Sequence, residues 1–129
     1  MSQFLLRAAC AAVALAASPV AHAAITDYAF QLVASEVAQG DATLIVRLVD
    51  KRDGKPVPNA VIFDTRLDMA PDGMETMTST VAPEPGGTPG EYRFKADITM
   101  EGGWRLSLAA KVQGEAGTVV GRLTFKARS

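Results

Sequence analysis

The chain has 129 residues, 48% of them hydrophobic, and a formal net charge of −1 at pH 7. So small a net charge gives no electrostatic basis for binding nucleic acid or an anionic membrane surface. The chain contains one Cys and one His, and both lie near its beginning, at Cys10 and His22.

The first 23 residues have the pattern of a secretory signal peptide. An Ala/Val/Leu-rich run covers residues 8–17, and Ala21-His22-Ala23 supplies small residues at A-x-A spacing. The apolar run is shorter than the ~20 residues that a membrane-spanning helix needs. We therefore expect residues 1–23 to be a signal peptide, and the product to be periplasmic or secreted without stable membrane insertion.

Processing gives a first testable prediction. Cleavage after Ala23 should give an exported protein that begins at Ala24 and has lost Cys10. Mass spectrometry of the exported protein measures this directly, and a product that keeps Cys10 would contradict it.

Removal of 23 of the 129 residues would leave 106 residues, predicted to form a single domain over 24–129. This mature chain has neither Cys nor His, so disulfides, catalytic triads and thiol nucleophiles are excluded. The remaining candidates for acid–base chemistry are Asp64, Asp68, Asp72 and Glu75, which we expect to be solvated surface groups. The prediction is therefore a protein that is not an enzyme.

Alternation of apolar and polar residues with a period of two predicts β-strands throughout the mature chain. Turn residues separate the runs, and the Pro- and Gly-rich stretch 83–90 is expected to be a loop outside any ladder. Seven runs without a helical stretch favour an all-β, immunoglobulin-like antiparallel β-sandwich of about seven strands. In chain order the runs are 28–34, 43–48, 59–69, 74–81, 92–99, 104–112 and 119–125.

Residues 90–112 carry the clearest alternation and are predicted to form a central β-hairpin. Its apolar face should be buried in one antiparallel pair of strands, with Trp104 as the largest side chain. In the run 59–69, a second apolar face is predicted to comprise Val61, Phe63, Thr65, Leu67 and Met69.

Several motifs in this order resemble the YtkA-like domain of the FixH family. They are the D-x-x-D-G-K-P-V-P-N-A step over 50–60, Leu67-Asp68-Met69, the turn 71–74, Met77, Gly90-Glu91-Tyr92 and Gly103-Trp104. The resemblance implies a small extracytoplasmic sandwich connected with copper supply to membrane oxidases or with metal efflux. The implied partners are a membrane metal transporter or an oxidase-assembly protein. The chain differs from FixH-type relatives by its expected cleavage and from metal-binding relatives by lacking His beside the methionines.

Four methionines are the candidate metal ligands. If the strands run up and down, Met69, Met74, Met77 and Met100 all fall toward one end of the sandwich. Thioether sulfur is a soft ligand that selects Cu(I), and it needs no deprotonation. The sequence thus predicts a methionine-bearing pole that could bind Cu(I).

Two other interpretations remain open. Met69 and Met100 are in phase with core positions, and methionine is a common gap-filler, so the methionines could be structural. Alternatively, Val33, Ile45 and Ile62 lie opposite the main apolar faces of their strands. Such a patch is typical of a protein-interaction or structural envelope module with no metal role.

Overall fold

The computed structural model describes residues 25–129, in which nine β-strands and two short 3₁₀ turns follow one another. The expected signal peptide, with Cys10 and His22, lies outside the described residues. The elements are η2 (Ile25–Asp27), β1 (Tyr28–Leu32), β2 (Glu36–Ala38), β3 (Gly40–Asp50), β4 (Ala60–Met69), η3 (Ala70–Asp72), β5 (Met74–Ser79), β6 (Val81–Glu84), β7 (Glu91–Ile98), β8 (Gly102–Val112) and β9 (Val119–Arg128).

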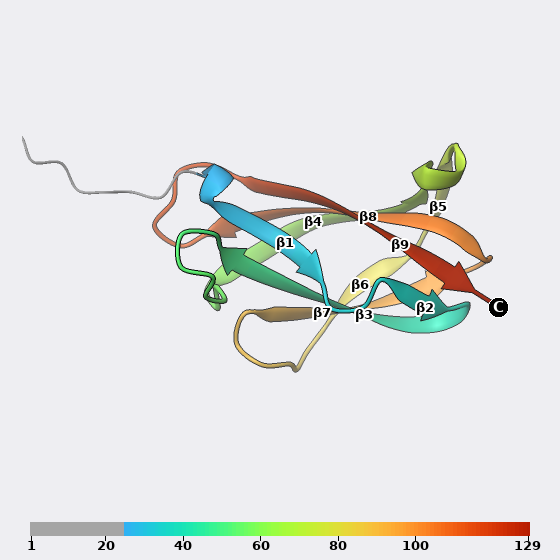
Figure 1. Ribbon diagram of the computed structural model, residues 1–129, viewed down its shortest axis with the longest axis horizontal. Coiled ribbons are helices and arrows are strands. Elements are labelled where there is room, and N and C mark those ends of the chain that lie inside the picture. Colours follow the sequence, from blue (N-terminus) through green and yellow to red (C-terminus); the bar gives the residue numbers. More distant parts are fainter. Residues whose placement is uncertain (1–24) are drawn as a thin grey trace, which may run out of the picture.

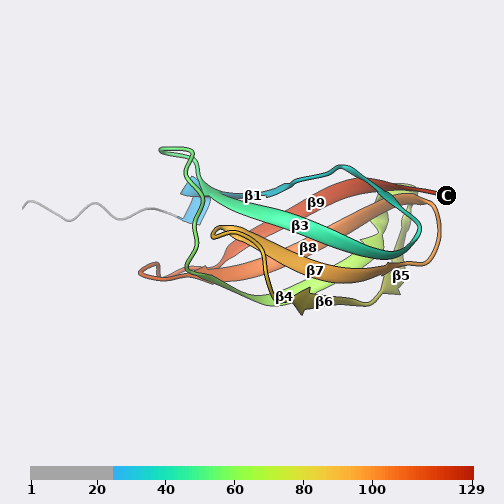
Figure 2. The same ribbon diagram turned by 90° about the horizontal axis from the view of Figure 1, so that it is seen from below.

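The strands form two facing sheets (Figures 1 and 2). Sheet A has the order β1-β3-β7-β6 and sheet B the order β2-β9-β8-β4-β5. Neighbouring strands are antiparallel except for the short β2, which pairs in parallel with β9. The predicted all-β, immunoglobulin-like sandwich is confirmed, with the short strands β2 and β6 added to the predicted ones.

The core lies between the sheets and is built from the inward face of each strand. Sheet A contributes Leu44, Leu48 and Phe94, and sheet B contributes Trp104 and Leu106. Along most of each strand these side chains alternate with less buried ones, most of them polar, as a sheet with one wet face requires.

The predicted central hairpin is wrong in its pairing. β7 pairs with β3 and β6 in sheet A, whereas β8 pairs with β4 and β9 in sheet B. The connection between them therefore crosses from one layer to the other. The indole N–H of Trp104 in β8 donates to the carbonyl of Met100 in this connection at 3.0 Å. Two amphipathic strands that face each other across a sandwich show the same alternation as two strands paired side by side, so the pattern does not distinguish these arrangements.

The predicted apolar face of residues 59–69 is wrong in its first half. A β-bulge between Ile62 and Asp64 shifts the register of β4 against β8. One extra residue exchanges the two faces of a strand, so Ile62 packs against the core while Val61 and Phe63 are 65% and 56% exposed. Leu67 and Met69 are buried as predicted.

The Pro-rich loop also begins later than predicted. Pro83 lies within β6 and opposes Phe94 of β7. β6 is the edge strand of sheet A, where a proline without an N–H group is tolerated.

Candidate functional site

The four predicted ligands lie on elements that meet near the end of the sandwich where η3 is drawn (Figure 1). Met69 ends β4 and is in register with Met74, the first residue of β5. Met77 follows on β5, and Met100 lies in the connection between β7 and β8. We call the end that carries these four residues the methionine-bearing pole.

The turn at this pole is fixed to the start of β8. The Gly103 N–H donates to Asp72 Oδ2 at 3.1 Å. Gly102 has φ +131°, and a Cβ there would collide with Asp72 and lie 3.0 Å from Met69 Cε. Glycine is thus required for the close approach of β8 to the turn, and β5 leaves the turn in a fixed position.

The methionines differ in their exposure. Met69 is fully buried and Met100 is partly buried against the core, whereas Met74 and Met77 are 38% and 37% exposed. The described residues contain no cluster of three or more His, Cys, Asp or Glu side chains that could hold a metal ion.

A polar cluster that the sequence analysis did not predict lies on the outer face of sheet B. Asp68 was expected to be solvated but is completely buried. Its Oδ2 accepts hydrogen bonds from Arg66 Nε at 3.0 Å and from Arg105 at 3.1 Å, and its Oδ1 accepts from the Ala70 N–H at 2.9 Å. The D-x-R-x-D alternation of β4 could have indicated a charged face, but Arg105 comes from a strand 37 residues away.

Burial acts to raise the pKa of Asp68, because it penalises the charged carboxylate. The hydrogen bonds from Ala70, Arg105 and Arg66 outweigh burial, and the pKa of Asp68 lies below its usual range. Asp68 is therefore a charged group inside the protein, and the two arginines compensate its charge.

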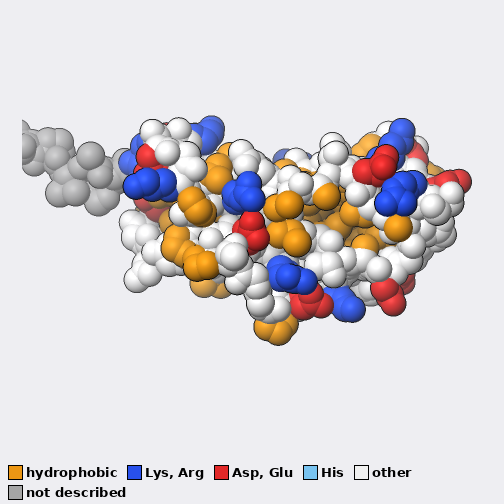
Figure 3. Space-filling model, turned by 60° about the horizontal axis from the view of Figure 1, so that its bottom comes forward, with side chains coloured by type: hydrophobic (Ala, Val, Ile, Leu, Met, Phe, Trp, Pro, Cys, Tyr) orange, Lys and Arg blue, Asp and Glu red, His pale blue; other side chains and the backbone are white. Residues whose placement is uncertain are grey.

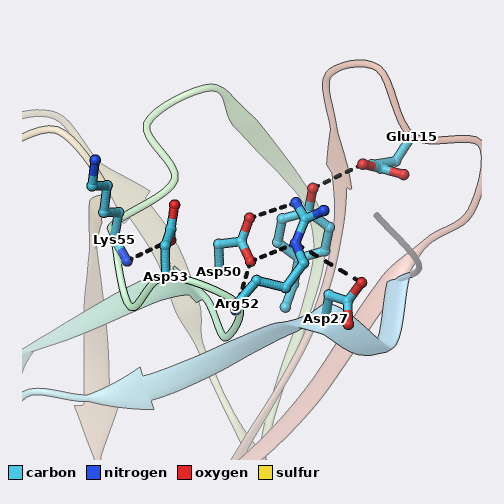
Figure 4. A network of polar contacts seen from close by, with 7 residues as sticks. Asp27, Asp50, Arg52, Asp53, Lys55 and Glu115 are labelled. Carbon is cyan, nitrogen blue, oxygen red and sulfur yellow. Dashed lines mark hydrogen bonds and ion pairs between the residues drawn. The ribbon is translucent and has the colours of Figure 1, made fainter. Parts of the chain in front are cut away.

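The opposite end of the sandwich has its own polar network (Figure 4). Arg52 donates from Nε and Nη2 to the two oxygens of Asp50, at 3.0 and 2.7 Å, and Arg52 Nε lies 4.0 Å from Asp27 Oδ2. The paired guanidinium lowers the pKa of Asp50. This network closes the turn after β3 and joins it to the start of β1.

The Gly90-Glu91-Tyr92 motif also has a structural role. The Tyr92 hydroxyl donates to the Val57 carbonyl at 2.6 Å and accepts from the Ala60 N–H at 3.2 Å. Gly90 has φ +88°, and a Cβ there would collide with Pro56. The motif thus holds the segment before β4 against sheet A.

The outer face of sheet A has charges of both signs lying side by side (Figure 3). Arg47 is paired with Glu91 at 3.0 Å. Arg93 Nε lies 3.5 Å from Glu84 Oε1, a looser contact without a well-formed hydrogen bond. The positive charges of both these arginines are compensated locally.

The predicted interaction patch is only partly present. Val33 is 48% exposed and Ile45 is half-buried, whereas Ile62 packs against the core because of the bulge in β4. Within residues 25–129, no helix has the length and apolar character needed to cross a bilayer.

Fold and surface together define an immunoglobulin-like sandwich domain with a methionine-bearing pole and a charged outer face. The YtkA-like family model matches residues 22–109, which is well over half of the chain. The chain therefore belongs to the YtkA-like family.

Comparison with other known proteins gives little beyond this. No curated protein matches the chain. Among solved structures, the Lin-41 filamin domain matches at 18% identity and a TM-score of 0.47, with 77% of this chain and 91% of that one covered. The ZirS C-terminal domain matches at 15% identity and a TM-score of 0.45, with 82% and 68% covered.

Proposed function

We propose that this protein is an exported, non-enzymatic binding domain that handles Cu(I) through its methionine-bearing pole. The supporting observation is that Met74 and Met77 are 38% and 37% exposed on β5, the strand that follows the turn held to β8 by Asp72. Most methionines in a small domain would be expected inside the core, as Met69 is. Two partly exposed methionines three residues apart on β5 are therefore accessible to a ligand.

The chemistry of these groups selects the metal. A neutral thioether binds soft Cu(I) and has little affinity for Zn(II), which prefers thiolate and imidazole. Because each thioether is a weak ligand, three or four are needed for useful affinity. Met74 and Met77 would bind from the surface and Met100 from the neighbouring connection, with Met69 completing the set from beneath.

Ligation and packing can be separated with Met74→Leu combined with Met77→Leu. Leucine keeps the volume and removes the sulfur, so the fold should persist while Cu(I) binding is lost. Cu(I) affinity would be measured under reducing conditions by competition with a chromophoric chelator, and Zn(II) should not bind to either protein.

A control comes from methyl NMR of the methionines with Ag(I), a redox-inert ion with similar preferences. The Met74 and Met77 methyl signals should move in the parent protein. A parent that binds neither ion, or a double variant that binds Cu(I) as tightly as the parent, would show that the methionines are structural.

For the biological role, we propose copper supply to a membrane metal transporter or to the assembly of a membrane oxidase, as in FixH-type relatives. A periplasmic location would place the domain next to such partners. Genes for copper transporters or oxidase subunits beside this one would favour this role over others.

A second candidate function is a protein-interaction or envelope module with no metal. The specific observation in its favour is that Val61 and Phe63 of β4 and Val120 of β9 are all largely exposed on the two strands that flank β8 in sheet B. Failure of the Cu(I) experiment would leave this function as the better supported one.

A further inference from the structure

Three arginines lie close together on the outer face of sheet B. Arg66 of β4 is in register with Ser107 of β8, which is in register with Arg122 of β9. Neighbouring strands are about 4.8 Å apart, so Arg66 and Arg122 flank Ser107 on either side. Arg105 is two residues from Ser107 and therefore projects from the same face. These four residues line a shared groove.

Asp68 fixes two of these guanidinium groups in place. Asp68 accepts hydrogen bonds from Arg66 Nε and from Arg105 Nη2. Arg66 Nη2 in turn donates to the Glu75 carbonyl at 2.5 Å. A buried ion pair contributes little net stability, because desolvation opposes the attraction between the charges. Its clearer effect here is to orient two guanidinium groups whose remaining N–H groups are left for another acceptor.

This face carries as many acidic groups (Asp64, Asp68 and Glu75) as arginines, but the guanidinium groups are not all paired. Asp68 is shared between Arg66 and Arg105, and the Arg122 side chain has no hydrogen bond or ion pair within residues 25–129. Arg105 Nε is buried without an acceptor. Arg47 and Arg93 of sheet A each lie beside a carboxylate, whereas Arg122 of sheet B forms no such ion pair in the described part of the chain.

Two features limit what this face can bind. Asp64 and Glu75 line the same groove, which disfavours a polyanion such as nucleic acid. Next to the arginines, Val120 is in register with Ala109, and β4 places Asp64 opposite Ala109 on the other side, with the exposed Val61 and Phe63 just before it. A free phosphate ion would leave this apolar surface unused.

We propose that the outer face of sheet B is a docking surface for a partner protein segment that carries carboxylate side chains beside apolar ones. The carboxylates bind Arg122, Arg105 and Arg66, because guanidinium and carboxylate match in charge and in bidentate geometry. The apolar side chains cover Val61, Phe63 and Val120. This surface adjoins the methionine-bearing pole, because Glu75 and Thr76 between Met74 and Met77 line the groove, but it does not require a metal.

The test uses the purified exported protein, free of metal, and three hexapeptides. The probe is (Leu-Glu)₃, and the two controls are (Leu-Gln)₃ without charge and (Ser-Glu)₃ without apolar side chains. Binding is followed by NMR through the arginine Nε–H signals and backbone amides, and inorganic phosphate is titrated separately. We expect the probe to bind at least fivefold more tightly than either control peptide, with shifts centred on Ser107, Arg105 and Arg122.

Arg122→Gln is the decisive variant, because Arg122 is exposed and its loss removes no internal contact. It should weaken probe binding about tenfold, as loss of a charge-assisted bidentate contact implies. Lys95→Gln, an equal change of charge on the exposed face of sheet A, should leave binding unchanged. Val120→Ser should weaken binding of (Leu-Glu)₃ but not of (Ser-Glu)₃.

Other results would overturn the proposal. These are a parent that binds none of the peptides, equal effects of Arg122→Gln and Lys95→Gln, or shifts at the arginines with phosphate alone that match those with the probe. Concentration-dependent shifts on this face without any peptide would show that a second copy of the chain occupies it instead. None of these results depends on Cu(I), so the two proposals fail independently.

Discussion

Trp104→Ala is expected to lower the free energy of unfolding by about 3–5 kcal/mol. Trp104 is the largest fully buried side chain, and its indole N–H holds the Met100 carbonyl at 3.0 Å. The substitution therefore leaves a cavity and releases the connection between the two sheets. Because a small domain has only about 5–15 kcal/mol of stability, this loss is a large share of the total and should lower the melting temperature markedly.

The measurement is chemical or thermal denaturation followed by circular dichroism, since Trp104 is the only tryptophan and its fluorescence is lost with it. Trp104→Phe serves as the matched control, because it keeps much of the volume and gives up a hydrogen bond worth about 1 kcal/mol. A Trp104→Ala protein that melts within a degree or two of the parent would contradict this account of the core.

The second large effect is expected at Asp68. Asp68→Asn should lower the free energy of unfolding at neutral pH by about 3 kcal/mol, because a neutral amide leaves Arg66 and Arg105 without their counter-charge. Asp64→Asn is the matched control, since Asp64 lies on the same strand, four residues before Asp68, and is exposed. It should change stability by no more than about 0.5 kcal/mol.

The effect of Asp68 should depend on pH in a defined direction. The pKa of Asp68 is lower in the folded protein than in the unfolded chain, so the unfolded state binds a proton more readily on acidification. The stabilisation from Asp68 is therefore present above the ordinary carboxyl pKa of about 4 and is lost as the pH falls through the folded-state value.

Unfolding curves of the parent and of Asp68→Asn between pH 7 and pH 3 measure this dependence. The difference between the two proteins should be largest at neutral pH and should shrink in acid. A difference that stays constant over this range would mean that Asp68 does not act through its charge.

The two proposed surfaces make different demands on the protein. Binding of Cu(I) would depend on Met74 and Met77 beside a turn that Gly102 and Asp72 hold in place. Docking of an acidic partner would depend on Arg122 and on the arginines oriented by Asp68. A domain that delivers a metal must bind a partner protein as well as the metal. A docking surface on the outer face of sheet B would therefore suit the proposed handling of Cu(I).

The sequence by itself determined the strands and most of their faces. Alternation along residues 92–99 and 104–112 correctly predicted that Phe94, Trp104 and Leu106 would be buried, because side chains in a strand point alternately to its two sides. It also determined that the described chain would be an all-β sandwich, and its motifs indicated the YtkA-like family. Each of these features depends on residues close together in the chain.

Only the tertiary structure decided which strands pair and what each face meets. Alternation is the same whether β7 and β8 lie side by side or face each other across the core, so the central hairpin was wrongly predicted. The single extra residue at the bulge of β4 turned Val61 and Phe63 outward, and no local pattern marks it. Asp68 became a buried charge because Arg105, on a distant strand, lies opposite it. Such contacts join residues far apart in sequence, and they exist only when the two sheets have assembled.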